Sequence, residues 1–325
     1  MAGWAGLPGD TASRATLWQG GTPTPLGTLG GSYAAAYGIN NRNQAVGVAS
    51  TAGDAAGRAT LWNGQRAQDL GTLSGTYGSA YDINDRGRVV GYSSIAGNAA
   101  SHATLWEGGR AIDLGTLGGS GSSAQAVNSG GLVAGSSDLA GDRTQHATLW
   151  RNGAIVDLGA LSSDGMSSAL GINTRGQVVG YSGSAFGGRP NATLWEDGRI
   201  IDLNTLVKSS DPNFLLYQAS DINDFGQIAA VGLTGDFQTH AYLLTPTFTT
   251  RSADELLAAT ALAKDVAGDG AGMPLDDTFA ADAGAVPEPA SLALLAMGLL
   301  ALLSARRSSD RRLAQRPALH RLASF

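Results

Sequence analysis

The sequence predicts an all-β protein, a β-propeller of 44-residue four-stranded repeats, followed by a flexible linker and a single C-terminal hydrophobic helix. The tetrapeptide Ala-Thr-Leu-Trp recurs with a period of 44 residues, which stretches to 45 at its last step. Each period offers four short strand candidates bounded by Gly, Asn or Asp, the size of one propeller blade. The tetrapeptide occupies 15–18, 59–62, 103–106, 147–150 and 192–195, with a degenerate copy at 241–244.

The four strand candidates of each repeat follow a fixed order. The first is Ala-Thr-Leu-Trp, the second ends in Asp-Leu-Gly, the third ends in Ile-Asn, and the fourth contains an apolar run such as Val-Val-Gly. Tight turns are expected at 62–65 and 84–87, where Gly supplies a positive φ. The asparagines that begin the second kind of turn are Asn40, Asn84, Asn128, Asn173 and Asn223.

One tryptophan per repeat is predicted to belong to the structural core. In a propeller, this side chain would wedge between neighbouring blades, and regular spacing is typical of a structural role. These residues are Trp18, Trp62, Trp106, Trp150 and Trp195.

The number of blades follows from counting strands. A leading fragment, five sets of four and a closing strand give about 22 strands, or five and a half blades. Two further strands upstream would let the N- and C-terminal strands complete one shared blade. Six blades is therefore preferred, with five blades and an unclosed spiral as alternatives. The chain begins inside a strand and shows no secretory signal peptide, so we expect the true start to lie upstream.

The repeat region resembles the HAF repeat, a family of presumed extracellular bacterial repeats. The clearest copies of its pattern are Leu-Gly-Thr-Leu-Gly-Gly at 114–119 and Gly-Gln-Val-Val-Gly at 176–180, and the resemblance covers residues 3–244. It implies an exported repeat domain and no agreed activity.

The C-terminal region has three parts: a Pro-Glu-Pro triplet, an uncharged apolar run and a basic pair. This order resembles the PEP-CTERM sorting signal of Gram-negative bacteria. The resemblance implies recognition by an exosortase, a membrane transpeptidase-like enzyme that cuts near the triplet. The matching positions are Pro287, Glu288, Pro289, Arg306 and Arg307.

The apolar run at 290–305 predicts a marginal transmembrane helix. Sixteen residues reach about 24 Å as a helix, a little short of a hydrocarbon core of about 30 Å. The positive-inside bias places the arginines in the cytoplasm and residues 1–289 on the far side of the membrane. A buried helix of a soluble domain is the alternative.

The chain thus divides into a repeat propeller at 1–248, a linker at 249–285, the sorting signal at 286–307 and a basic tail at 308–325. Within the linker, Ser252 and a partly apolar pattern predict a short helix at 253–266. Members of the sorting family usually stop soon after the basic pair, so the tail departs from their pattern.

Composition narrows the classes of function. The 21 basic and 27 acidic residues give a net charge of −6, which does not favour binding to nucleic acid. The lack of cysteine excludes disulfides, thiolate zinc sites and thiol catalysis. We find no nucleophile elbow, His-Glu-x-x-His pair or phosphate-binding glycine loop, and we expect no catalytic residue, metal or cofactor. Segments 82–87 and 221–226 faintly resemble calcium loops, but tight hairpins explain their Asn, Asp and Gly equally well.

A candidate binding face is predicted at the ends of the blades that carry the long loops. The residue just before each tetrapeptide is always polar but varies in type, and the one sizeable insertion, at 207–217, reaches the same end. The alternative is that these residues are only solvated strand ends. The candidates are Arg14, Arg58, His102, His146, Asn191 and His240, with Phe214 and Tyr217 from the insertion.

The preferred function is an exported surface or matrix protein with a binding or scaffolding role, processed by exosortase, and extracellular polysaccharide is a candidate partner. One alternative is a polysaccharide hydrolase or lyase, with Asp164 and Asp211 as candidate carboxylates. Another is an adhesin-like or ice-binding protein that displays a flat threonine ladder. That ladder would contain Thr16, Thr60, Thr104, Thr148 and Thr193.

Overall fold

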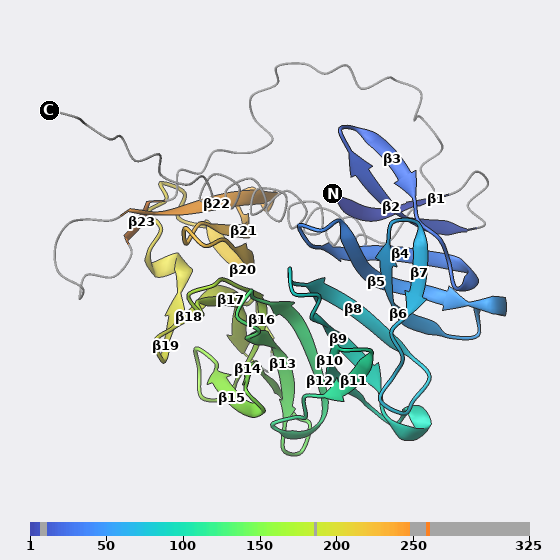
Figure 1. The fold of residues 1–325 in the computed structure, drawn as a ribbon. Coiled ribbons are helices and arrows are strands. Elements are labelled where there is room, and N and C mark those ends of the chain that lie inside the picture. Colours follow the sequence, from blue (N-terminus) through green and yellow to red (C-terminus); the bar gives the residue numbers. More distant parts are fainter. Residues whose placement is uncertain (7–11, 185–186, 248–257, 261–325) are drawn as a thin grey trace, which may run out of the picture.

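Six small antiparallel sheets follow one another along the chain in an arc (Figure 1). The computed structural model describes residues 1–6, 12–184, 187–247 and 258–260. Sheet 1 has three strands, and sheets 2 to 6 have four strands each. The all-β prediction is therefore confirmed, and the contacts among the described residues form an arc of sheets rather than a closed ring.

Consecutive strands pair with one another in every sheet. Sheets 1 to 3 contain β1 (Ala2–Gly6), β2 (Ser13–Gln19) and β3 (Thr22–Pro25); β4 (Gly30–Ile39), β5 (Gln44–Thr51), β6 (Gly57–Asn63) and β7 (Arg66–Asp69); and β8 (Gly78–Ile83), β9 (Val89–Ser94), β10 (Ser101–Glu107) and β11 (Arg110–Asp113).

Sheets 4 to 6 repeat the same order. They contain β12 (Gly118–Val127), β13 (Val133–Leu139), β14 (Gln145–Arg151) and β15 (Ala154–Gly159); β16 (Gly165–Ile172), β17 (Val178–Ser184), β18 (Asn191–Glu196) and β19 (Arg199–Asp202); and β20 (Leu215–Ile222), β21 (Ile228–Leu233), β22 (Thr239–Thr247) and β23 (Ala258–Thr260). The described residues include three short 3-10 helices in loops: η1 (Ala52–Asp54), η2 (Ala96–Asn98) and η3 (Leu203–Thr205).

The first strand of each of sheets 2 to 6 is called the inner strand, because these strands contact one another in succession along the arc. The inner strands are β4, β8, β12, β16 and β20. Each inner strand has a shift in its pairing register that begins four residues before the asparagine of the following turn. In β8, for example, the shift lies between Ala80 and Asp82, ahead of Asn84. Such a bulge bends the strand and increases its twist.

A separate hydrophobic core lies between each pair of neighbouring sheets. The core between sheets 2 and 3, for example, joins Val46 and Ala59 to Ala80, Val89 and Trp106. Alanine is present in every core and is the commonest residue in those between sheets 1 and 2 and between sheets 4 and 5, where its small side chain lets the sheets approach closely. In four cores, the later sheet contributes a buried tryptophan, namely Trp62, Trp106, Trp150 or Trp195.

Trp18 differs from the other four repeat tryptophans because it is only half-buried. By the pattern of the other sheets, it faces away from sheet 2, toward the side on which a preceding sheet would lie. Sheet 1 is the first sheet of the arc, so no preceding sheet among the described residues covers this ring.

The expectation that the N- and C-terminal strands complete one shared blade is wrong for the described strands. Strands β1 to β3 form a sheet of their own, whereas β22 belongs to sheet 6. The outer edge of β22 pairs with β23, through Thr245–Thr260 and Thr247–Ala258. The terminal strands therefore belong to different sheets, since a later segment occupies the edge that a shared blade would need.

The segment predicted as a short helix, 253–266, has only three described residues. These three, β23, are extended and paired with β22, so the helix is wrong at this position. The edge of β22 offers unpaired backbone groups, and this short segment pairs with them. The rest of 253–266, the sorting signal and the basic tail lie outside the described residues.

Candidate functional site

A tight turn follows each inner strand, and one asparagine side chain holds it. The Oδ1 atom of Asn84 accepts hydrogen bonds from the backbone N–H groups of Arg86 (3.0 Å) and Arg88 (3.1 Å). The backbone of Gly87 takes a φ of 80°, which favours glycine. Asparagine suits this position because its carbonyl oxygen mimics a backbone acceptor within the turn.

The same asparagines also link each sheet to the next. The Nδ2 group of each donates to the backbone carbonyl of the corresponding asparagine in the following sheet. We call this series the asparagine ladder. Its links are Asn40 to Asn84 (3.2 Å), Asn84 to Asn128 (3.0 Å), Asn128 to Asn173 (2.9 Å) and Asn173 to Asn223 (3.2 Å).

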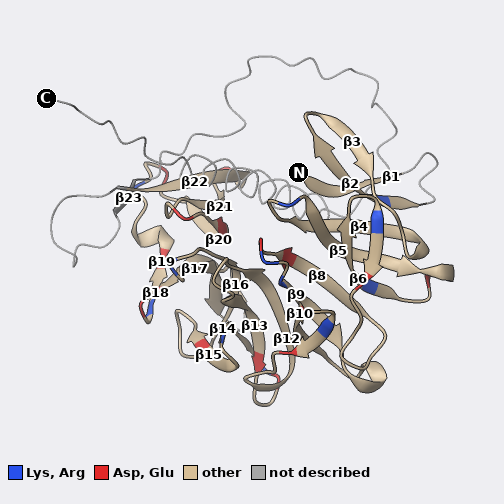
Figure 2. Cartoon of the chain, viewed as in Figure 1, with Lys and Arg blue, Asp and Glu red and all other residues tan. Residues whose placement is uncertain are grey.

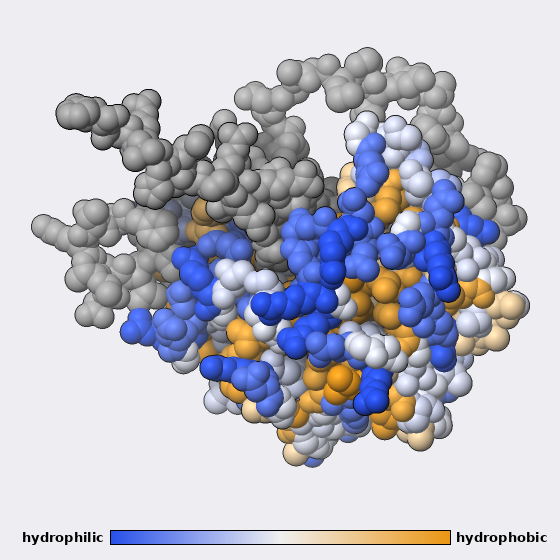
Figure 3. All heavy atoms as spheres, viewed as in Figure 1, coloured by the Kyte–Doolittle hydropathy of each residue, from blue (hydrophilic) through white to orange (hydrophobic). Residues whose placement is uncertain are grey.

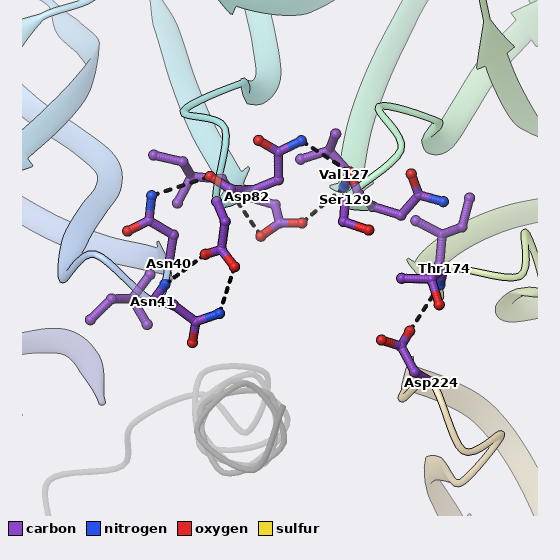
Figure 4. A pocket seen from close by; sticks show the side chains of 13 residues that line it. Asn40, Asn41, Asp82, Val127, Ser129, Thr174 and Asp224 are labelled. Carbon is purple, nitrogen blue, oxygen red and sulfur yellow. Dashed lines mark hydrogen bonds between the residues drawn. The ribbon is translucent and has the colours of Figure 1, made fainter. Parts of the chain in front are cut away.

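A polar pocket lies where these turns converge (Figure 4). Its lining side chains come from sheets 2 to 6 and include the acids Asp82, Asp85 and Asp224. The Asp85 carboxylate accepts from Asn41 N (2.9 Å) and Asn41 Nδ2 (2.6 Å), and Asp224 accepts from the backbone of Thr174 (2.9 Å). These acids therefore join neighbouring turns, in parallel with the asparagine ladder.

In segments 82–87 and 221–226, which faintly resemble calcium loops, the carboxylates of Asp82 and Asp221 accept hydrogen bonds from backbone N–H groups. Asp82 accepts from its neighbour Ile83 N and, across the junction, from Val127 N, each at 2.8 Å. Asp221 accepts from Ile222 N at 2.8 Å. In the described part of the chain, no group of three or more His, Cys, Asp or Glu side chains has the arrangement needed for a metal ion.

The predicted binding face lies at the opposite end of the sheets from this pocket. There, in four of the five repeats, the residue before the Ala-Thr-Leu-Trp segment pairs with an aspartate on the next strand. The pairs are Arg58 with Asp69 (3.0 Å), His102 with Asp113 (2.8 Å), His146 with Asp157 (2.8 Å) and Asn191 with Asp202 (2.7 Å).

Arg14 and Arg58 also reach the following sheet. Arg14 Nη1 donates to Ser32 O at 3.1 Å, and Arg58 Nη1 donates to Thr76 O at 3.1 Å. The residues just after these acceptors are Tyr33 and Tyr77, which are 44% and 47% exposed. Each of these two arginines thus binds the backbone next to an exposed tyrosine, and the two tyrosines are one repeat apart.

Behind Tyr33 lies a row of three half-buried tyrosines. The ring centroids of Tyr37 and Tyr81 are 5.8 Å apart, and those of Tyr81 and Tyr92 are 5.7 Å apart. The hydroxyls of Tyr33 and Tyr37 lie 3.4 Å from each other. Burial raises the pKa of Tyr37 and Tyr81 above the ordinary tyrosine value, so these hydroxyls stay protonated.

The insertion brings Phe214 and His240 together through a third ring. Phe214 packs edge-on against Tyr242 at 5.2 Å, and the His240 ring lies 6.3 Å from the same tyrosine. Tyr217 is half-buried in β20. Phe214 therefore contributes mainly to the core of sheet 6.

The two candidate catalytic carboxylates differ in their surroundings. Asp211 accepts from Asn213 N (2.9 Å) and Gly235 N (2.6 Å), and so connects the insertion to the β21–β22 loop. Asp164 is exposed in the loop before β16. The Asp211 carboxylate therefore holds the insertion and the β21–β22 loop together.

The threonine ladder expected for an ice-binding surface is wrong. Each threonine is at most 2% exposed, and its hydroxyl donates to the backbone carbonyl two residues earlier, at 2.8 to 3.0 Å. These side chains lie in the cores between sheets. They cannot present a flat surface to ice.

Comparison with protein families gives one match, at the C-terminus. The chain carries a PEP-CTERM protein-sorting motif at residues 285–308. This motif supports exosortase-dependent sorting of an exported protein and implies export to the cell envelope and surface. A search of curated proteins finds no match. Among the described residues, no helix has the length and apolar character needed to cross a membrane.

Sequence reasoning did not predict the asparagine ladder or the tyrosine row. The sequence around the recurring asparagines indicates turns, and their period equals that of the tryptophans. A regular spacing indicates that the asparagines have the same role in every repeat. It does not show whether their side chains bond within the turn or to the next sheet. The tyrosines occur in only some of the repeats, so periodicity does not reveal them.

Proposed function

We propose that this protein is an exported scaffold that exosortase delivers to the cell surface or matrix, where it binds extracellular polysaccharide. The sorting motif at 285–308 is the observation that carries the proposal. The repeated sheets support it, because four of the junctions between sheets bury a tryptophan in the same position. Residues 290–305 would anchor the precursor in the membrane before processing.

We further propose that the arc of sheets belongs to a six-bladed propeller. Six consecutive sheets support this arrangement, and the inner strands of sheets 2 to 6 contact one another in succession. In such a ring, sheet 6 would face the half-buried Trp18. Small-angle X-ray scattering would test the shape, since a ring gives a compact disc and an open spiral gives a longer maximum dimension.

The binding face proposed for polysaccharide centres on Tyr33 and Tyr77, with Arg14 and Arg58 beside them. Tyrosine offers a rigid, amphipathic contact area, and Tyr and Arg are frequent among the residues that dominate binding energy. The hydrogen bonds that fix Arg14 and Arg58 reduce the conformational entropy lost on binding. Equivalent positions one repeat apart suit a polymer whose sugar units also repeat. On the face shown in Figure 3, hydrophobic areas are interspersed with hydrophilic ones.

Charge distribution agrees with a neutral or weakly charged partner. Basic and acidic residues lie interspersed over the described sheets (Figure 2). Arg58 is already paired with Asp69. A polymer with many hydroxyl groups would hydrogen-bond to such a surface without needing a strong electrostatic field.

The sorting step is tested by fractionating producing cells and measuring the intact mass of the protein in each fraction. The wild type should appear in the envelope or medium with an end near Pro289. Replacing Glu288 with Gln should leave an unprocessed species in the membrane fraction, whereas Asp282→Asn, just outside the motif, should behave as wild type. A wild-type protein that keeps Phe325 in every fraction would contradict the sorting proposal.

The binding face is tested by co-sedimentation with polysaccharide purified from the same cells. The double variant Tyr33→Ala/Tyr77→Ala should lose most of the binding. Phe225→Ala is the matched control, because Phe225 is an exposed aromatic residue (59%) at the opposite end of the sheets. Equal binding by the double variant and the control would refute this face.

A further inference from the structure

Two tyrosines of β4 meet at their hydroxyl groups. The hydroxyl oxygens of Tyr33 and Tyr37 lie 3.4 Å apart, although four residues of a regular strand span about 13 Å. β4 is not regular, because its pairing register with β5 shifts both before and after the segment 34–36. Tyr33 lies in the first shift and Tyr37 in the second. Such irregularities bend a strand and re-aim its side chains, which brings the two hydroxyls together.

The ring of Tyr37 also packs against a second tyrosine. Its centroid is 5.8 Å from that of Tyr81, which in turn lies 5.7 Å from the ring of Tyr92. Aromatic pairs at such separations attract each other and hold their rings in place. Burial, and then the neighbouring Tyr33 hydroxyl, raises the pKa of Tyr37 above the ordinary value of 10.0, so the group that faces Tyr33 is a neutral phenol. The contact therefore joins two phenols, one of which has a fixed ring.

The next repeat contains the same spacing without the same contact. Tyr77 and Tyr81 are also four residues apart, and the exposed fraction of Tyr77, 47%, is close to the 44% of Tyr33. β8 begins after Tyr77, and its pairing register shifts only once. In the described part of the chain, no hydrogen bond joins the Tyr77 and Tyr81 hydroxyls, and Tyr81 packs on Tyr92. The geometry of the folded strand thus distinguishes the first pair from the second.

We propose that Tyr33 and Tyr37 form a site of oxidative modification, where hydrogen peroxide and a haem peroxidase join the two rings by a carbon–carbon bond. Each phenol loses one electron and one proton and becomes a radical. The two radicals couple at the ring carbons next to their oxygens, and the hydrogens on those carbons move to the oxygens, which restores both phenols. The peroxide takes up the two electrons and two protons and becomes two molecules of water.

The observed contact suits this reaction. Because each ring bonds through a carbon next to its hydroxyl, the two oxygens of the product lie side by side, as they already do in the structure. Groups that are held near their reacting geometry react faster than groups that must first find it. The bond would fix the ring of Tyr33, which belongs to the proposed binding face, but its formation does not depend on polysaccharide.

The test treats the purified full chain with hydrogen peroxide and a haem peroxidase, and then compares two tryptic peptides by mass spectrometry. Peptide 15–42 contains Tyr33 and Tyr37, peptide 67–86 contains Tyr77 and Tyr81, and neither contains another tyrosine or a methionine. Peptide 15–42 should lose the mass of two hydrogen atoms and give no fragments from cleavage between its tyrosines. Peptide 67–86 should keep its mass, and the monomeric protein should gain the fluorescence of dityrosine.

Two variants and one solution condition separate the contact from other causes. Tyr33→Phe should lose the dityrosine fluorescence of the monomer, whereas Tyr77→Phe, the matched control with a similar exposed fraction, should keep it. In concentrated urea, the two peptides should lose mass to similar extents, because their tyrosines have the same spacing once the strands are unfolded. These measurements do not involve polysaccharide, so their failure is distinct from a failure of the proposed binding function.

Any of three results would overturn the proposal. The first is equal loss of mass by the two peptides in the folded protein, because spacing alone would then account for the reaction. The second is a cross-link that joins peptide 15–42 to peptide 67–86, or one chain to another, in place of the bond within peptide 15–42. The third is a Tyr33→Phe monomer whose dityrosine fluorescence equals that of Tyr77→Phe.

Discussion

The side-chain amide of Asn128 donates a 2.9 Å hydrogen bond to the backbone carbonyl of Asn173 in the next sheet, while its oxygen accepts from Leu132 N at 3.0 Å. One buried side chain therefore closes its own turn and connects two sheets.

Asn128→Ala should lower the free energy of unfolding by about 2 kcal/mol, because the N–H of Leu132 loses its acceptor and the carbonyl of Asn173 keeps only its bond from Gly176 N. Ser129→Ala, at the next position, is the control and should change stability by less than about 0.5 kcal/mol. Urea denaturation followed by tryptophan fluorescence measures both. Similar losses for the two variants would show that the ladder bond contributes little.

Tryptophan-to-phenylalanine substitutions should differ between repeats. Trp62 Nε1 donates to Gly27 O at 2.8 Å, whereas the buried Trp150 Nε1 has no hydrogen-bond partner in the described structure. Both variants lose similar apolar contacts, but only Trp62→Phe leaves an acceptor unpaired. We expect Trp62→Phe to cost about 1 to 2 kcal/mol more than Trp150→Phe in the same denaturation experiment. Equal costs would contradict this account.

Close approach between strands should make Gly91 intolerant of a side chain. A Cβ there would lie 2.0 Å from Ser79 O, so the two strands would have to separate. Gly91→Ala should lower the unfolding free energy by about 3 kcal/mol. Gly57→Ala adds the same methyl group with an ordinary contact, and its effect should stay below about 1 kcal/mol. Thermal or urea unfolding of the pair would show whether strand separation is the cause.

Stability should depend on pH through Asp54. Hydrogen bonds from the Ser50 hydroxyl, and then from the backbone and hydroxyl of Ser32, hold the pKa of Asp54 below its ordinary value of 3.8. A carboxyl whose pKa is lowered by folding stabilises the protein above the unfolded pKa, and this contribution disappears as pH falls through the folded pKa. The difference in melting temperature between wild type and Asp54→Asn should be constant from about pH 5 to 8 and shrink below 3.8.

The next repeat supplies the control for this pH experiment. Asn98 occupies the position equivalent to Asp54, and its Oδ1 accepts from Thr76 N at 2.8 Å. An amide does not titrate in this range, so the effect of Asn98→Ala should not vary with pH. A parallel pH dependence in both variants would exclude Asp54 as its source.

The sequence predicted the all-β class and the positions of the strands because the repeat is regular and Gly, Asn or Asp turn residues bound each short strand. The tight turns at Gly64 and Gly87 were predictable because these positions need a positive φ. The strand at 258–260 was not, since its hydrogen-bond partner is an edge that exists only in the folded protein. The half-buried state of Trp18 was also unpredictable, because it depends on where the sheet lies in the arc.

For the candidate binding face, the sequence predicts the location but not the ion pairs. Its position at the long-loop end follows from antiparallel alternation, and the structure places Arg58 and His102 there. The aspartates that pair with them are eleven residues later in the sequence, on the neighbouring strand. This pairing depends on which residues of the two strands lie opposite each other, and the hydropathy pattern does not predict that register.

The asparagine ladder spans intervals of unequal length. Asn128 and Asn173 are 45 residues apart, and Asn173 and Asn223 are 50 apart, yet the bonds are 2.9 and 3.2 Å long. The added residues lie in loops at the other end of the sheets. Loops of different length there leave the junctions unchanged, so the exposed loops of one repeat can differ from those of the next while the interface between repeats stays the same.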